Sequence, residues 1–175
     1  VGGLDEALVR NQDDELNYRL TESGWRIWFD SRIRSVYHAR SSYGKLFRQY
    51  RQYGYWKVFV NRKHRTVTTW RQLAPAAFLL VLVALTVGAL VDLGLPEADR
   101  WTNLAAPALA TVLGTWMLGA IGSVILSGVG WRDAIGVMRA FLILHVAYGW
   151  GYWQGVLDFL MLRRSPSAES KRLTR

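Results

Sequence analysis

Long hydrophobic segments in the second half of the chain constrain its fold more than any other feature. No charged residue occurs between Leu73 and Val91, and the apolar stretch extends to about Leu95. This length is close to the roughly 20 residues that an α-helix needs to cross a hydrocarbon core. A second apolar segment follows, from about Leu104 to Val129. The sequence therefore predicts a membrane region.

A third segment, 140–162, is also apolar enough to insert into a membrane. A full crossing would place a group of basic residues on the outer side of the membrane: Arg163, Arg164, Lys171 and Arg172. That placement conflicts with the positive-inside rule, and a re-entrant or interfacial segment would avoid the conflict. We therefore expect two or three membrane helices.

Small residues lie at helical spacing in two of these segments. Ala110, Gly114 and Gly122 share one face of the second segment and would let a neighbouring helix approach closely. In the third segment, three glycines are expected to permit close packing or a bend rather than to bind phosphate: Gly149, Gly151 and Gly155.

The charge is distributed unevenly around the membrane region. From Arg40 to Arg71 there are nine Lys or Arg residues and no Asp or Glu, whereas Asp92, Glu97 and Asp99 follow the first apolar segment. A basic block of this kind suits nucleic acid or an anionic membrane surface, and the neighbouring apolar segments favour membrane lipids. We predict no nucleic-acid partner and a location at the cell inner membrane, with the polar part in the cytoplasm.

The polar first part of the chain has a pattern that predicts an α/β fold. Asn11 is a candidate N-cap for a helix that Gly24 would end, and the segments 25–29 and 33–37 have the aromatic and β-branched character of short strands. Residues 42 to about 64 instead predict an amphipathic interfacial helix. The expected organisation has four parts: a catalytic part over 1–40, a basic interfacial helix over 41–71, a membrane region over 72–162 and a disordered basic tail over 163–175.

Carboxylates crowd the first turn of the helix that is expected after Asn11. Asp13, Asp14 and Glu15 could simply complement the positive end of the helix dipole. Sugar transfer with inversion also needs a base to take a proton from the acceptor hydroxyl, and a helix start fixes a carboxylate well for that purpose. The position of Asp13 is compatible with either role.

The motifs around this helix resemble those of the family 2 glycosyltransferases, in which a Gly-Gly-Phe-Asp-Glu-like segment precedes Glu-Asp-x-Asp-Leu-x-x-Arg-Leu. The matching residues are Gly2, Gly3, Asp5, Glu6, Asp13, Glu15, Leu16, Arg19 and Leu20. The resemblance implies that Asp13 is the catalytic base and that Gly2, Gly3, Asp5, Glu6 and Arg19 contribute to substrate binding. Gln12 departs from the pattern, because the family commonly has Glu there.

Further motifs narrow the resemblance to the ExoA-like branch, named for an enzyme of succinoglycan biosynthesis. They are Arg48-Gln49-Tyr50, Tyr53-Gly54 and His145-x-x-Tyr148-Gly149-x-Gly151. The resemblance implies the C-terminal portion of a GT-A-type α/β domain. It also implies that the nucleotide-binding half and its Asp-x-Asp motif precede Val1, together with most ligands of a divalent cation such as Mg²⁺ or Mn²⁺. This chain alone would then be inactive.

One face of the expected interfacial helix carries amides and aromatic rings. Four side chains lie within about 100° of one another at 3.6 residues per turn and could bind sugar hydroxyls or diphosphate: Gln49, Gln52, Tyr53 and Trp56. An ordinary amphipathic helix with its aromatic side chains among lipid headgroups explains the same pattern.

His38 follows a predicted strand, and it is either a metal ligand or substrate contact, or a structural residue.

Taken together, these features predict a membrane-bound inverting glycosyltransferase. The resemblance implies that it transfers a hexose from a nucleotide-sugar donor to a polyprenyl-diphosphate-linked acceptor in exopolysaccharide biosynthesis. Two alternatives are a processive polysaccharide synthase, for which the hydrophobic region is short, and a non-enzymatic membrane adaptor that binds anionic lipid through residues 40–71.

Overall fold

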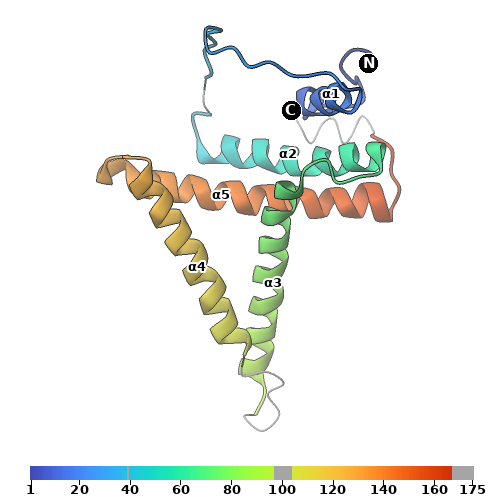
Figure 1. Cartoon of the computed structure of the whole chain (residues 1–175). Helices are drawn as coiled ribbons and strands as arrows, with labels where there is room; N and C mark the ends of the chain where they lie inside the picture. The colour runs from blue at the N-terminus through green and yellow to red at the C-terminus, as the bar shows by residue number, and fades with distance from the viewer. Residues whose placement is uncertain (39, 97–103, 167–175) are drawn as a thin grey trace.

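The computed structural model describes residues 1–38, 40–96 and 104–166. Figure 1 shows five α-helices joined by irregular chain and short helical turns. In chain order the helical elements are α1 (Gln12–Glu22), α2 (Tyr43–His64), the 3-10 turn η1 (Trp70–Gln72), α3 (Leu73–Gly94), α4 (Ala105–Leu126), α5 (Trp131–Gly155) and the π-helical turn η3 (Val156–Met161).

No β-strand occurs in the part of the chain that the structure describes, so the prediction of an α/β, GT-A-type portion is wrong. The segments 25–29 and 33–37 form an exposed, irregular connection between α1 and α2 (Figure 1). Trp28, Phe29 and Val36 are 88%, 87% and 84% exposed. A segment with strand-like composition forms a strand only where a neighbouring strand pairs with it, and no such neighbour lies among the described residues.

The polar first part contains only the helix α1. Asn11 occupies the N-cap position, but it has a left-handed conformation (φ 62°) and its side chain does not cap the helix. Instead, its amide donates a hydrogen bond to the carbonyl oxygen of Tyr53 at 3.0 Å, which ties the start of α1 to α2. Gly24 is left-handed (φ 82°) just after the helix ends, as the sequence predicts.

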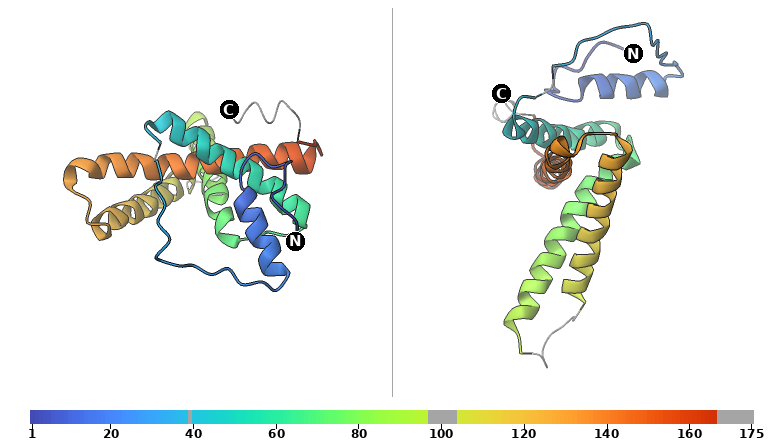
Figure 2. Two further views of the ribbon diagram at one scale, coloured as in Figure 1. Left: turned by 90° about the horizontal axis from the view of Figure 1, so that it is seen from above. Right: turned by 90° about the vertical axis from the view of Figure 1, so that its left-hand side faces the viewer.

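The helices α2 and α5 run side by side in the same direction (Figures 1 and 2). Glycines bring their backbones together, and a Cβ added to Gly155 would lie 2.7 Å from the carbonyl oxygen of Tyr55. The core lies in this layer, where the buried rings of Trp56 and Phe159 pack 6.0 Å apart between their centroids. Leu8 packs into the same core and secures the segment before α1.

The helices α3 and α4 form a hairpin that projects from the α2–α5 layer, and α5 runs across α3 rather than along it (Figure 2). In the described residues, three helical stretches are long and apolar enough to cross a membrane: Trp70–Gly94, Ala105–Leu126 and Trp131–Met161. These helices fit a membrane protein. The acidic residues Glu97 and Asp99, and most of the predicted tail, lie outside the described residues.

Candidate functional site

A polar pocket lies where α1, α2, η1 and α5 meet. Its volume is about 350 Å³. The lining residues are Asn11, Asp13, Asp14, Tyr53, Lys57, Thr69, Gln72 and Tyr148. The pocket therefore combines carboxylates, amides, hydroxyls, aromatic rings and the ammonium group of Lys57, which are groups that proteins use to hold polar molecules.

The candidate base Asp13 lies in the first turn of α1 and opens into this pocket. Its side chain is exposed, and it makes no hydrogen bond or ion pair with any residue that the structure describes. Asp13 is thus available to accept a proton from a molecule in the pocket.

The neighbouring carboxylate of Asp14 has a protein partner instead. It forms an ion pair with Lys57 of α2, whose side chain is almost completely buried, whereas Asp14 is half exposed. This pair neutralises Asp14 and fixes the wall of the pocket. Asp13 therefore leaves one negative charge in excess among the lining residues.

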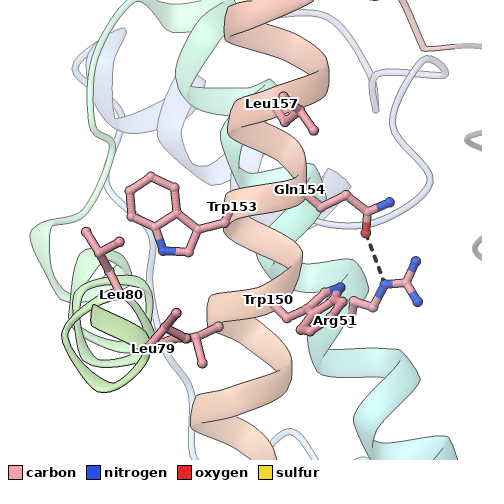
Figure 3. A pocket seen from close by; sticks show the side chains of 8 residues that line it. Arg51, Leu79, Leu80, Trp150, Trp153, Gln154 and Leu157 are labelled. Atoms are coloured by element: carbon pink, nitrogen blue, oxygen red, sulfur yellow. Dashed lines mark hydrogen bonds between the residues drawn. The ribbon is translucent and has the colours of Figure 1, made fainter. Parts of the chain in front are cut away.

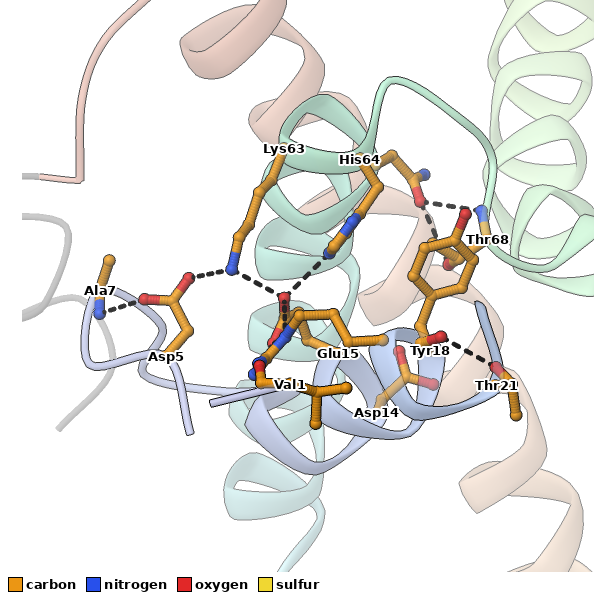
Figure 4. Close-up of polar contacts among 12 residues, drawn as sticks. Val1, Asp5, Ala7, Asp14, Glu15, Tyr18, Thr21, Lys63, His64 and Thr68 are labelled. Atoms are coloured by element: carbon orange, nitrogen blue, oxygen red, sulfur yellow. Dashed lines mark hydrogen bonds and ion pairs between the residues drawn. The ribbon is translucent and has the colours of Figure 1, made fainter. Parts of the chain in front are cut away.

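A third carboxylate, Glu15, forms a charged cluster that the sequence analysis did not predict (Figure 4). Glu15 is fully buried and accepts hydrogen bonds from Arg19 at 2.9 Å, from Lys63 at 2.7 Å and from His64 at 2.9 Å. Burial alone would raise the pKa of Glu15, but these three donors lower it to about 2. A carboxylate held so firmly in its ionised form anchors α1 to the end of α2.

The same cluster holds the glycine-rich segment at the start of the chain. Lys63 also donates to Asp5 at 2.8 Å, and Arg19 donates to the carbonyl oxygens of Gly3, at 2.6 Å, and of Val1. Burial opposes the ionised form of Asp5, yet Lys63 and the amide of Ala7 bring its pKa below the ordinary value.

Of the residues predicted to bind substrate, Asp5, Gly3 and Arg19 therefore have structural partners here, while Gly2 and Glu6 are exposed. Lys63 and His64 were missed because nothing in a single sequence pairs position 15 with the end of a helix almost 50 residues later. Composition also could not show that Glu15, alone among the three carboxylates of the first turn, would be buried.

The predicted amide and aromatic face of α2 is mostly buried. Gln49 accepts a hydrogen bond from Arg40 at 2.9 Å and donates to the Tyr53 hydroxyl at 2.7 Å. Gln52 accepts from Arg10 at 2.8 Å. The Trp56 ring lies in the core against Phe59 and Phe159. A role of these residues in substrate binding stays a prediction, and in this structure their neighbours are protein groups.

His38 is exposed in the irregular segment before α2. No cluster of three or more His, Cys, Asp or Glu side chains suited to a metal ion occurs in the described part of the chain. The described residues thus do not by themselves form a site for the divalent cation, and Asp13 and Asp14 share their pocket with the cation of Lys57.

A second, larger pocket of about 640 Å³ lies where α5 crosses α3. Figure 3 shows that Leu79 and Leu80 of α3 lie at one end and that Arg51 and Gln154 lie at the other. The Nε atom of Arg51 donates to the Gln154 side-chain oxygen at 3.2 Å, so the guanidinium has a neutral partner. Trp150, Trp153 and Leu157 line the apolar part. The pocket therefore suits a molecule with a hydrocarbon portion and an anionic end.

Comparison with known proteins finds a relative that matches most of the chain. The chain is 31% identical over 161 residues to the Succinoglycan biosynthesis protein ExoA of Rhizobium meliloti (strain 1021). The match covers 91% of this chain and 44% of that protein, so the chain spans less than half the length of its relative. No protein-family model matches the chain, and no solved structure is similar to it. The similarity confirms the resemblance to ExoA that the motifs indicated.

Proposed function

We propose that this chain is the membrane-associated part of an inverting glycosyltransferase of exopolysaccharide biosynthesis. The observation that carries the proposal is the unpartnered carboxylate of Asp13, which opens into a polar pocket between α1 and the α2–α5 layer. The similarity to a succinoglycan biosynthesis protein supports the pathway. The resemblance of the motifs to family 2 glycosyltransferases supports the reaction class.

In the proposed reaction, Asp13 takes the proton of an acceptor hydroxyl while its oxygen attacks the anomeric carbon of a hexose. The new glycosidic bond forms as the bond to the nucleotide diphosphate breaks, and the leaving group carries away the electron pair. A positioned general base contributes roughly 10²- to 10⁴-fold to such a step. The described residues contain no cluster of three or more His, Cys, Asp or Glu side chains that could hold the divalent cation.

We further propose that the acceptor is linked to a polyprenyl diphosphate. The apolar pocket between α3 and α5 supports this choice, because its leucine and tryptophan walls suit an isoprenoid chain and Arg51 suits a phosphate. The pocket would hold the lipid portion at the membrane while the sugar reaches the polar side of the layer.

The proposed location is the cell inner membrane, with α1 and its pocket on the cytoplasmic side. The basic residues of α2 support this orientation through their attraction to the anionic cytoplasmic leaflet. The hairpin of α3 and α4 would cross the membrane, and the α2–α5 layer would lie along its surface.

The Asp13→Asn substitution in the intact enzyme separates this function from a non-enzymatic membrane adaptor. The substitution removes a proton acceptor from an exposed position without disturbing a described contact. We expect sugar transfer to membrane lipid to be lost while the protein remains in the membrane fraction. Sugar transfer at the wild-type rate would contradict the proposed function, and an adaptor would transfer no sugar even without the substitution.

A further inference from the structure

Gln72 is one of the residues that line the Asp13 pocket, and it is only 7% exposed. It lies in η1, where the chain passes from α2 into the membrane hairpin. Its Nε2 atom is buried and has no hydrogen-bond partner among the residues that the structure describes. Buried amide donors are rarely left in this state, so a particular cause is required.

A chain of hydrogen bonds fixes the orientation of this amide. The backbone N–H and the hydroxyl of Thr68 both donate to Asn61 Oδ1 at 3.3 Å. Asn61 Nδ2 in turn donates to Gln72 Oε1 at 3.1 Å. With Oε1 occupied in this way, rotation of the amide would break the bond to Asn61. The Nε2 donor is therefore held in place before any ligand arrives, as is expected of a recognition group.

The charge of the pocket indicates which ligand would accept this hydrogen bond. Asp14 and Lys57 neutralise each other, so Asp13 leaves an excess negative charge. A phosphate or diphosphate would be repelled by this charge, whereas a neutral hydroxyl can both accept from an amide and donate to a carboxylate. The rings of Tyr53 and Tyr148 add surfaces against which the apolar face of a sugar can pack.

We propose that Gln72 Nε2 donates a hydrogen bond to one hydroxyl oxygen of the acceptor sugar and thereby selects which sugar presents its hydroxyl to Asp13. This inference rests on the proposed glycosyltransferase function. Gln72 is a positioning and specificity residue, since it recognises the acceptor and exchanges no proton with it. A site built to bond a hydroxyl discriminates strongly against an analogue that lacks it, because the buried group is then left unpaired.

The test uses citronellyl-diphosphate-linked hexoses and their monodeoxy analogues, with binding measured on the intact protein in nanodiscs. We expect the wild-type protein to bind one monodeoxy analogue at least about tenfold more weakly than its parent hexose. The variant Gln72→Met keeps the side-chain volume but has no donor. It should bind the parent about tenfold more weakly and show no further loss with that analogue.

Gln12→Met is the matched control, because the Gln12 amide donates to the Leu8 carbonyl oxygen and is not part of the pocket wall. It should keep the wild-type preference. A Gln72→Met variant that discriminates like the wild type would overturn the inference, as would failure of the wild type to bind any probe or to distinguish the analogues. Failure of the proposed catalytic role would show separately, as sugar transfer retained by the Asp13→Asn variant.

Discussion

Two carboxylates of α1 lie only two positions apart and have opposite environments. On a helix this spacing turns side chains by about 200°, so Asp13 and Glu15 face opposite sides. Asp13 opens into the polar pocket, whereas Glu15 is completely buried among Arg19, Lys63 and His64. The first turn of α1 thus carries both a carboxylate that is free to act and one that holds the helix in place.

Glu15→Gln should destabilise the docking of α1 because it removes the buried negative charge that Arg19, Lys63 and His64 hold between α1 and the end of α2. We expect a loss of about 3 kcal/mol in the free energy of unfolding, measured by denaturant unfolding in micelles. Glu22→Gln is the control, because Glu22 is exposed at the end of the same helix. An equal effect of the two substitutions would contradict the anchoring role of Glu15.

The same anchor has a defined pH dependence. The folded-state pKa of Glu15, about 2, lies below its ordinary value of 4.5, so its stabilisation is complete above pH 4.5 and disappears as the pH falls through about 2. Wild-type stability should therefore fall more steeply over this interval than that of the Glu15→Gln variant.

At the scale of the elements, close backbone packing of α2 against α5 supports both pockets. A Cβ added to Gly151 would lie 2.7 Å from the carbonyl carbon of Arg51, and backbone cannot yield to it easily. Gly151→Ala should therefore separate the helices and lower the free energy of unfolding by about 1–3 kcal/mol. Thermal unfolding in nanodiscs measures the effect.

The control for this substitution is Gly119→Ala in α4, where an added Cβ meets no atom within 4 Å. It should be neutral or slightly stabilising, because alanine favours the helix more than glycine does. If Gly151→Ala were as mild as Gly119→Ala, the close packing of α2 and α5 would be refuted.

The helices could be predicted because each carries its own pattern. Residues 42–64 and the apolar segments show helical periodicity or membrane length, and helices α2 to α5 occupy these regions. The segments 25–29 and 33–37 carry no comparable pattern of their own, because whether a segment forms a strand depends on a partner elsewhere in the chain. Helix partners were also hard to predict: Gly114 and Gly122 face open space, whereas Gly88 of α3 lies close to Ala105 of α4.

The candidate site shows the same contrast between local features, which could be predicted, and contacts between distant segments, which could not. The location of Asp13 at a helix start follows from Asn11 and the carboxylate run, which are local features. The pocket itself needs α2, η1 and α5, so Lys57 and Gln72 could not be identified from one sequence. Trp56 illustrates the limit, because the spacing that placed it on a face with Gln49 and Gln52 could not say whether that face meets substrate or core.

At the scale of the whole molecule, α5 crosses the hairpin of α3 and α4 instead of extending it (Figure 2). If the hairpin spans the membrane, α5 then lies along the membrane surface beside α2, and both of its ends are on the cytoplasmic side. The basic residues after α5 consequently stay inside, which removes the conflict with the positive-inside rule.

Single cysteines test this topology, because the chain has no native cysteine. Thr66→Cys, Ser127→Cys and Ser165→Cys place one thiol before α3, one after α4 and one after α5, all at exposed positions. We expect a membrane-impermeant maleimide to label all three from the cytoplasmic side only. Labelling of Ser165→Cys from the side opposite to Ser127→Cys would show that α5 crosses the membrane.

The proposed role of Asp13 is tested by the single-turnover rate of sugar transfer by the intact protein with Asp13→Asn, measured at saturating acceptor. We expect a rate at least about 100-fold below that of the wild type, with membrane attachment unchanged. Glu22→Gln should retain the wild-type rate. A wild-type rate for Asp13→Asn would show that the proton is accepted elsewhere and would contradict the role of Asp13 as the general base.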